Sequence, residues 1–405
     1  MAKVYPFRAL RPAESFASAV ASVPYDVVNR EEARELGKDS RSFLHVTKPE
    51  IDLDDSVDLY APQVYAQGRA ALDRLVKEGI LVRDEDASFF LYRLTMNGRT
   101  QTGFVMTADV GEYDQNIVRK HEYTRPDKED DRVRNIEALA AQSGNVFLAH
   151  RDHATLTDVT QSTLQESTLY DFEAVDGIRH EIWKIDASKN TAILGAFEEL
   201  GPIYIADGHH RSAAASRVAK LPGAGDDAQR FLVVSFPESE LKIWDYNRVV
   251  DDLNGYTGEE LLAKLEEVGA IRKVEGPESK RHEVSVYLGG TWYQLSFASH
   301  LINEEDPVGR LDVSLLQSHV LEPLLGIDNP RTNKRIQFVG GIRGADELVK
   351  RVDQGGGVAF KMYPPSLDEL FTIADAGEVM PPKSTWFEPK LRDGLFVHVL
   401  DSLTK

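Results

Sequence analysis

Pro202-Ile203-Tyr204-Ile205-Ala206-Asp207-Gly208-His209-His210-Arg211 is the stretch around which the rest of the chain can be interpreted. Its apolar run, 203–206, predicts a short buried strand, and Asp207-Gly208 is a turn dipeptide in which Asp207 is also a good helix N-cap. The Ala-rich segment 212–220 predicts a helix that ends at Pro222-Gly223. Two histidines and an arginine therefore occupy the first turn of a helix, directly after a strand.

This turn has the chemistry of a phosphate site. The first N–H groups of a helix are unpaired and its dipole is positive there, so phosphate is a suitable ligand. Gly208 lets a ligand approach the backbone, and Arg211 can grip phosphate oxygens in a bidentate manner. The dipole disfavours a histidine cation, so His209 or His210 can act as a neutral donor or as a base.

Two alternatives belong to the same turn. Asp207 caps the helix, which is the simpler expectation, or it holds a metal or a substrate hydroxyl. The motif as a whole is either a ligand site, which we favour, or a tight strand–helix turn whose polar residues face solvent.

Two further segments are candidates for the same site. His121-Glu122-Tyr123-Thr124-Arg125-Pro126 places an acid, a base, a hydroxyl and a guanidinium within six residues. His121 and Glu122 are catalytic candidates there, and Thr124 and Arg125 are phosphate-binding candidates; the alternative is a solvated charged loop. Near the C-terminus, Lys383, Ser384 and Thr385 follow two prolines, but the glycines of a phosphate-binding P-loop are absent. The alternative for this loop is a proline-braced connection whose aromatic residues enter the core.

Composition excludes several classes of function. The 405 residues carry a net charge of −19, which argues against general nucleic-acid binding and against anionic membrane surfaces. The chain has no cysteine, which excludes disulfides, thiolate metal sites and a cysteine nucleophile. No apolar run approaches the roughly 18 residues of a membrane span, and the N-terminus lacks the apolar segment of a secretory signal. We therefore expect a cytoplasmic protein.

A protein-held metal is not expected. Adjacent histidines on a helix point about 100° apart, so His209 and His210 do not readily share one ion. If Mg²⁺ takes part, it is held through the phosphates of a nucleotide.

Strand and helix patterns alternate with hairpins, so the predicted class is α+β with a mixed sheet. Expected strands are 42–46, 88–95, 100–108, 146–149, 180–185, 203–206, 231–236, 283–288, 291–297 and 396–400. Expected helices are 65–77, 127–142, 191–200, 212–220 and 313–321, with capping boxes at Asn29, Thr257 and Ser366. We expect two domains, 1–245 with the central motif and 246–405 with the Met380-Pro381-Pro382-Lys383-Ser384-Thr385 loop.

The chain resembles the bacterial and archaeal family catalogued as domain of unknown function 1015, over nearly its whole length. The resemblance rests on 205–211 and on further motifs: Phe7-Arg8-Ala9-Leu10-Arg11-Pro12, Pro24-Tyr25-Asp26-Val27, Ser42-Phe43-Leu44-His45-Val46, His121-Glu122, Arg125-Pro126, Asp131-Arg132, 380–385, Phe387, Pro389-Lys390 and Gly394-Leu395. One departure is Tyr246-Asn247-Arg248, where a second His-Arg pair is expected and only Arg248 can carry over.

That family is similar to the ParB/sulfiredoxin group of nucleotide-binding folds, which includes free-serine kinases, partition proteins that bind CTP, and sulfiredoxins. The resemblance implies a ParB/sulfiredoxin-like mixed-sheet core with extensive additional α/β elements, and nucleotide phosphates at 207–211. Sulfiredoxin chemistry is excluded because His209 stands where those enzymes have a cysteine.

From these observations we expect a kinase that moves a phosphoryl group between ATP or ADP, with Mg²⁺, and a small hydroxy amino acid such as serine. A nucleotide-sensing module and a phosphoserine phosphatase are the alternatives. The expected partners are the nucleotide and the small-molecule substrate, with no nucleic acid and no membrane. The oligomeric state stays open, with a homodimer among the alternatives.

Overall fold

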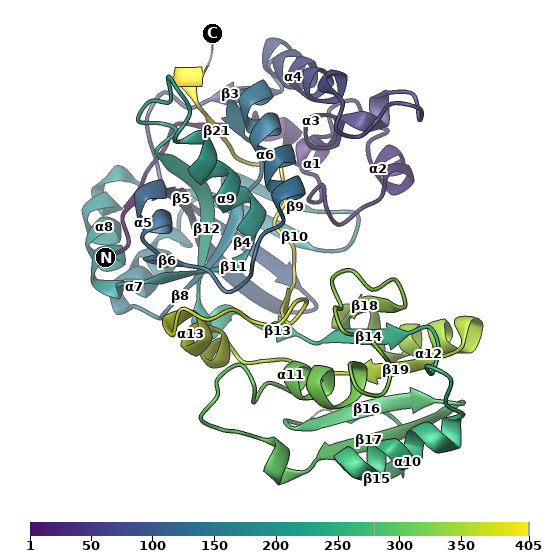
Figure 1. Ribbon diagram of the computed structural model, residues 1–405. Helices are drawn as coiled ribbons and strands as arrows, with labels where there is room; N and C mark the ends of the chain where they lie inside the picture. The colour runs from purple at the N-terminus through teal and green to yellow at the C-terminus, as the bar shows by residue number, and fades with distance from the viewer. Residues whose placement is uncertain (279, 404–405) are drawn as a thin grey trace. The chain divides into compact units, whose positions relative to one another are not determined.

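The computed structural model describes residues 1–278 and 280–403 (Figure 1). The chain forms two compact units. The first contains Met1–Leu241 and returns to include the chain from Pro389 onward, and the second is Lys242–Glu388. The expected division at residue 245 stays a prediction. The compact units divide between Leu241 and Lys242 instead, and the C-terminal segment belongs to the first unit. The reason is that its strand and side chains pair with N-terminal elements.

A mixed sheet forms the centre of the first unit (Figure 1). Its described strands, in spatial order, are β6 (Val118–Arg119), β11 (Ile203–Asp207), β8 (Val146–His150), β12 (Arg230–Pro237), β5 (Arg99–Asp109), β4 (Phe90–Met96), β10 (Arg179–Lys184) and β9 (Tyr170–Glu173), with β1 (Val4–Tyr5) paired to β5. β11 is parallel to β6 and antiparallel to β8, whereas β8 is parallel to β12. The predicted α+β class with a mixed sheet is confirmed.

A smaller antiparallel sheet joins the two ends of the first unit. Its order is β3 (Leu81–Arg83), β2 (Ala9–Pro12), β21 (Val397–Val399) and β7 (Ala141–Gln142). β21 thus lies between strands from residues 9–12 and 141–142, which anchors the C-terminal segment in this unit.

Helices cover the sheets of the first unit. They are α1 (Ala17–Val20), α2 (Arg30–Leu36), α3 (Leu44–Thr47), α4 (Pro62–Lys77), α5 (Val110–Asp114), α6 (Pro126–Leu139), α7 (Ala154–Thr163), α8 (Asn190–Leu200) and α9 (His209–Val218). α9 packs against α6 and α5 and contacts β8 and β12. Small residues of α9, such as Ala214, allow this close packing against Val133 and Ile136 of α6.

The predicted strand 42–46 is wrong, because these residues lead into α3. Phe43, Leu44 and Val46 are all buried, and the Thr47 hydroxyl donates to the Phe43 carbonyl one helical turn earlier. With only three apolar residues among the five, Ser42-Phe43-Leu44-His45-Val46 is too short for a period that would separate a buried strand from a buried helix. The predicted helix 127–142 ends earlier, at Leu139, because Ala140 adopts a left-handed conformation with φ 47° and the next two residues form β7.

The second unit is built on an antiparallel sheet. Its order is β15 (Gly269–Val274), β17 (Thr291–Phe297), β16 (Glu283–Leu288), β19 (Val358–Lys361), β14 (Tyr246–Val250) and β18 (Ile336–Gly340), with helices α10 (Gly258–Val268), α11 (Asp312–Leu316), α12 (Gly344–Gly355) and α13 (Leu367–Asp375). α11 continues as a π-helical turn over Gln317–Leu321, so the predicted helix 313–321 is present with a wider last turn. The two ends of the unit, β13 (Ile243–Trp244) and β20 (Trp386–Phe387), pair with each other.

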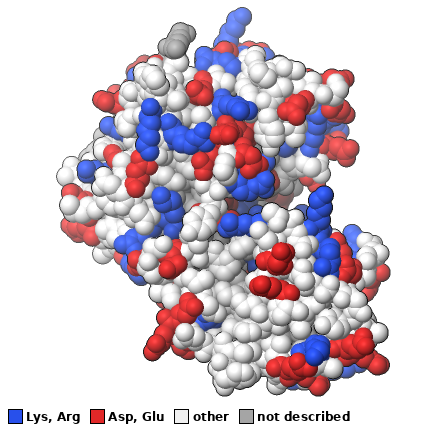
Figure 2. All heavy atoms as spheres, in the orientation of Figure 1, with Lys and Arg blue, Asp and Glu red and all other residues white. Residues whose placement is uncertain are grey.

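Figure 2 shows acidic and basic side chains interspersed over the visible face, so on this face the acidic excess is spread rather than gathered. None of the helices in residues 1–278 and 280–403 is both long enough and apolar enough to cross a bilayer.

Candidate functional site

The turn between β11 and α9 has the conformation of a ligand-binding loop. Gly208 is the N-cap residue of α9 and has φ 95°. A Cβ atom at this position would lie 3.3 Å from the Val146 Cα, so a side chain here meets both backbone strain and backbone contact. No side chain among the described residues caps α9. The positive end of the helix dipole at this first turn is therefore not covered by a capping side chain.

Asp207 does not cap the helix, so the simpler expectation for this residue is wrong. Its carboxylate accepts a hydrogen bond of 2.8 Å from the Lys390 ammonium. Burial acts to raise the pKa of Asp207, but the charges of Lys390 and Arg211 outweigh it and hold the pKa below its ordinary value. Asp207 is therefore an ionised carboxylate beside a lysine contributed by the C-terminal segment.

The segment 121–125 lies beside the start of α9, because β6 and β11 are neighbouring parallel strands whose carboxyl ends meet at one edge of the sheet. The rings of His121 and His209 meet edge to face, with centroids 4.5 Å apart. The backbone N–H of Arg125 donates to Nε2 of His210 at 3.1 Å, and that of His121 donates to Nε2 of His209 at a longer 3.4 Å. Three of the predicted residues, His121, His209 and His210, are thus brought together.

The buried histidines are neutral at physiological pH. Burial lowers the pKa of His121 to about 4, against smaller opposing effects of the Ile205 backbone and Asp207. Burial, together with the neighbouring His121, also lowers the pKa of His209 well below its ordinary value. Because Nε2 of His209 accepts a hydrogen bond, the proton of its neutral ring is assigned to Nδ1. Nε2 of His210 is likewise an acceptor. These contacts favour a bracing role for the two imidazoles over a role as bases at Nε2.

The remaining predicted residues of this segment have other partners. The Thr124 hydroxyl donates to Glu129. The Arg125 guanidinium pairs with Asp127 at 2.9 Å and its side chain is 62 % exposed. Glu122 is half-buried. Binding of phosphate by Thr124 or Arg125 stays a prediction, since the contact of Arg125 with α9 is made by its backbone.

Arg211 extends from the first turn of α9 into a pocket. Its guanidinium donates to the Asn145 carbonyl at 2.6 Å and lies 3.7 Å from the Asp26 carboxylate. This pocket is partly open to solvent. It is lined by Tyr25, Thr47, Arg132, Asn135, Ile136, Gln142, Ser143, Gly144, Val146, Arg211, Phe231, Leu232 and Asp393.

A second arginine and a carboxylate complete this pocket. The guanidinium of Arg132 stacks 3.8 Å from the centroid of the Tyr25 ring and pairs with Asp131 at 2.6 Å. Asp393 is 1 % exposed, and neither of its carboxylate oxygens has a hydrogen-bond partner among the described residues. Burial raises the pKa of Asp393 to about 7, although Arg211 opposes this effect.

Tyr25, Arg132, Lys390 and Asp393 are site residues that the sequence alone did not predict. A signal existed for three of them, since Tyr25, Arg132 and Lys390 lie in motifs that carry the family resemblance. Nothing in the local sequence distinguishes Asp393, which reaches the pocket only because its backbone pairs with Ser22.

The loop with Lys383, Ser384 and Thr385 belongs to the second unit. Its conformation is fixed there: Arg248 donates to the Lys383 carbonyl at 3.0 Å, and the Ser384 hydroxyl donates to the Pro381 carbonyl at 2.6 Å. Burial lowers the pKa of Arg248 to about 10. Phosphate binding by this loop stays a prediction, and Arg248 has a structural role in holding it.

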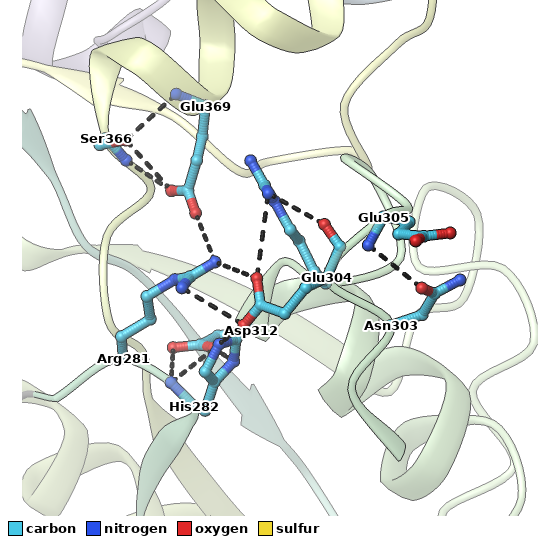
Figure 3. Close-up of polar contacts among 9 residues, drawn as sticks. Arg281, His282, Asn303, Glu304, Glu305, Asp312, Ser366 and Glu369 are labelled. Atoms are coloured by element: carbon cyan, nitrogen blue, oxygen red, sulfur yellow. Dashed lines mark hydrogen bonds and ion pairs between the residues drawn. The ribbon is translucent and has the colours of Figure 1, made fainter. Parts of the chain in front are cut away.

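The second unit also contains a network of charged residues (Figure 3). Asp312 is buried and accepts hydrogen bonds of 2.9 and 3.1 Å from the backbone N–H of His282, which has φ 63°. Burial raises the pKa of Asp312 to about 7. Arg281 joins Glu304 and Glu369 at 3.2 and 3.4 Å. Because these groups satisfy one another, the network fixes the turn at His282 and the start of α13.

Comparison with known proteins gives one family. The model of the family described as protein of unknown function (DUF1015) matches residues 4–314. No curated protein matches the chain at a significant level.

Several solved structures are similar to this one. SbnI with C-terminal truncation from Staphylococcus aureus is 12% identical, with a TM-score of 0.41, and the match covers 73% of this chain and 87% of that one. A conserved hypothetical protein from Pyrococcus furiosus is 14% identical, with a TM-score of 0.37 and coverage of 73% and 95%. A free serine kinase in complex with AMP is 13% identical, with a TM-score of 0.36 and coverage of 72% and 91%.

Proposed function

The chain belongs to the family described as protein of unknown function (DUF1015), and we propose that it is a nucleotide-dependent phosphotransferase. Its reaction moves the terminal phosphoryl group of ATP or ADP to the hydroxyl of a small amino acid such as serine. The observation that carries this proposal is the start of α9, where Gly208 leaves the helix end open and Arg211 follows in the first turn.

A nucleotide phosphate fits the chemistry of this turn. Within the described part of the chain, the start of α9 has no side-chain cap, so a phosphate can occupy the position that a capping side chain would otherwise take. His121 and His209 are held neutral. Arg211 and Lys390 are therefore the groups that would neutralise the charge of the phosphate. Phosphoryl transfer depends mainly on positioning and on charge neutralisation, and these are the properties that the turn offers.

Mg²⁺ would be held through the phosphates rather than by a protein cage. The described residues bring no three His, Asp or Glu side chains together as a metal site. When bound, the ion neutralises the phosphate oxygens.

Asp207 is the residue best suited to orient the acceptor. Because its pKa is lowered, the carboxylate is ionised and can accept a hydrogen bond from a substrate hydroxyl. In the transfer, a bond forms between the acceptor oxygen and the terminal phosphorus, the bond from that phosphorus to the bridging oxygen breaks, and the hydroxyl proton passes to Asp207. Lys390, whose ammonium donates to Asp207 at 2.8 Å, would neutralise charge on the transferred group.

The test is direct. The protein is incubated with ATP or ADP, Mg²⁺ and L-serine, and O-phosphoserine is measured by mass spectrometry. We expect turnover that falls by at least about a hundredfold in Asp207→Asn, as expected when a group that contacts the reacting atoms is removed. Glu14→Gln, which changes a surface residue of the same unit, serves as the control.

Two results contradict the proposal. Stabilisation by ADP without turnover across a panel of hydroxy amino acids indicates a nucleotide sensor. Release of phosphate from O-phosphoserine without any nucleotide indicates a phosphatase.

A further inference from the structure

The pocket beside Arg211 holds a buried carboxylate that no described protein group satisfies. Asp393 is 1 % exposed, it lines the pocket, and both of its oxygens lack hydrogen-bond partners among the described residues. A buried carboxylate that is neither paired nor hydrogen-bonded is unfavourable. The arrangement therefore indicates a ligand that brings hydrogen-bond donors to Asp393.

The same pocket also attracts a negative group. Arg132 and Arg211 both line it. Arg132 stacks 3.8 Å from the Tyr25 ring centroid, and Arg211 lies 3.7 Å from Asp26. Neither of these described arginines hydrogen-bonds to Asp393, although the charges of Arg211 and Arg132 both act on its carboxyl group. Asn135 and Ser143 add uncharged polar groups to its wall.

A ligand that pairs with Asp393 and also with Arg132 and Arg211 must carry a cationic group and an anionic group a few bonds apart. A free α-amino acid has this structure, since its ammonium is a compact donor of three hydrogen bonds and its carboxylate fits a guanidinium in bidentate geometry. An inorganic phosphate or a nucleotide phosphate would satisfy the arginines only, and it would bring a second negative charge toward Asp393.

We propose that this pocket binds the zwitterionic end of a free amino acid, with Asp393 accepting from the ammonium and with Arg132 and Arg211 donating to the carboxylate. The identification of this amino acid as the phosphoryl acceptor rests on the proposed function. Because Arg211 also belongs to the first turn of α9, it places the amino acid next to the proposed phosphate site. The hydroxyl of serine then extends toward Asp207.

Calorimetric titration of the full chain tests the pocket with three small ligands. The probes are L-serine, D-glycerate, which has a hydroxyl in place of the ammonium, and ethanolamine, which lacks the carboxylate. We expect L-serine to bind at least tenfold more tightly than either of the other two. In Asp393→Asn, L-serine binding should weaken at least tenfold while ADP binding stays within twofold. Asp401→Asn is the matched control, since Asp401 lies in the same C-terminal segment and pairs with Arg83.

A second measurement needs no variant, in case Asp393→Asn does not fold. The ionisable groups that act on Asp393 are Arg211, Asp26, Arg132 and Arg392. At pH 7 the carboxyl is partly protonated, so an ammonium bound to it must displace a proton. Calorimetry of L-serine binding in buffers of different ionisation enthalpy should therefore show net proton release, and D-glycerate should show none.

The outcomes separate this inference from the proposed function. Unchanged L-serine binding in folded Asp393→Asn overturns the inference, and so does equal loss of L-serine and ADP binding. ADP binding without any L-serine binding by the wild-type protein, or no proton release on binding, overturns it as well. Asp393-dependent L-serine binding without formation of O-phosphoserine leaves the inference standing and contradicts the phosphotransferase.

Discussion

Asp393 makes the stability of the protein depend on pH in an unusual direction. Burial raises its pKa from 3.8 to about 7. Below pH 3.8 the carboxyl is protonated in both the folded and the unfolded chain. Between that pH and about 7 the unfolded chain releases the proton while the folded chain keeps it, so folding becomes less favourable by about 1.4 kcal/mol per pH unit. Above about pH 7 the folded chain also releases the proton, so the loss of stability no longer grows.

Asp393→Asn removes this dependence. We expect the free energy of unfolding of the variant, relative to the wild type, to rise by about 2–3 kcal/mol between pH 5 and pH 8. Urea unfolding at the two pH values measures this change. Asp401→Asn should show no such change over this range, because the pairing with Arg83 lowers the pKa of Asp401 and the stability that it contributes is lost only as the pH falls to about 3.8 and below. A relative stability of Asp393→Asn that is flat with pH would show that the carboxylate is paired in solution.

Gly208 is a second residue whose effect can be predicted. Gly208→Ala places a side chain at φ 95° and 3.3 Å from the Val146 Cα. We expect a loss of unfolding free energy of about 1–2 kcal/mol or more, from the left-handed conformation and the contact together. Gly177→Ala is the matched control, since Gly177 has φ 75° but a Cβ atom there would meet no described atom within 4 Å. Gly208→Ala should also weaken ADP binding, and Gly177→Ala should not; equal behaviour of the two variants would contradict a ligand role for the turn.

At the scale of elements, α9 holds the segment 121–125 through its two histidines. In His210→Ala, the Arg125 amide loses its acceptor, 3.1 Å away. We expect hydrogen exchange at Arg125 to become at least tenfold faster, because local opening no longer breaks this bond. His153→Ala is the control, since His153 precedes α7 and pairs with Glu199 at the surface. Unchanged exchange at Arg125 would show that other contacts hold the segment.

Elements with local signals could be predicted from the sequence. Asn97 and Gly98 adopt positive φ angles of 52° and 76° and close the β4–β5 hairpin, as their residue types predict. The capping boxes at Asn29, Thr257 and Ser366 are all present. The turn at Gly208 belongs to this group, because strand, glycine and helix are adjacent in the sequence.

The pocket could not be predicted in the same way. Arg132 lies on α6, Tyr25 in a loop, and Asp393 in the C-terminal segment, and only tertiary pairing brings them together. The mistaken strand at 42–46 has a related cause, since the burial of Phe43, Leu44 and Val46 on several sides removes the periodicity that a helix at a surface would show.

At the scale of the whole molecule, the second unit is an insertion in the sequence of the first. The first unit takes its strand β21 and two site residues, Lys390 and Asp393, from the segment after the insertion. The ends of the inserted unit pair directly, with Ile243 opposite Phe387. Partners in an antiparallel pair have Cα atoms about 4.5–5.5 Å apart, so a short linker can replace the whole insertion.

We therefore expect that replacing residues 242–388 by about four Gly or Ser residues gives a folded protein that unfolds in one cooperative transition and binds ADP. Removing the segment from Pro389 onward should abolish folding of the first unit, because β2 and β7 lose the strand between them. Circular dichroism, thermal unfolding and ADP titration measure both results.

The same shortened protein tests the loop of the second unit. If Lys383 binds a nucleotide phosphate, the shortened protein and the full-length Lys383→Ala variant should lose ADP affinity by a similar factor, since each lacks the same ammonium. If the phosphates are held by α9, Arg211 and Lys390 alone, both proteins should bind ADP as the wild type does. If the shortened protein binds ADP weakly while the Lys383→Ala variant binds it as the wild type does, the second unit contributes to ADP binding through groups other than Lys383.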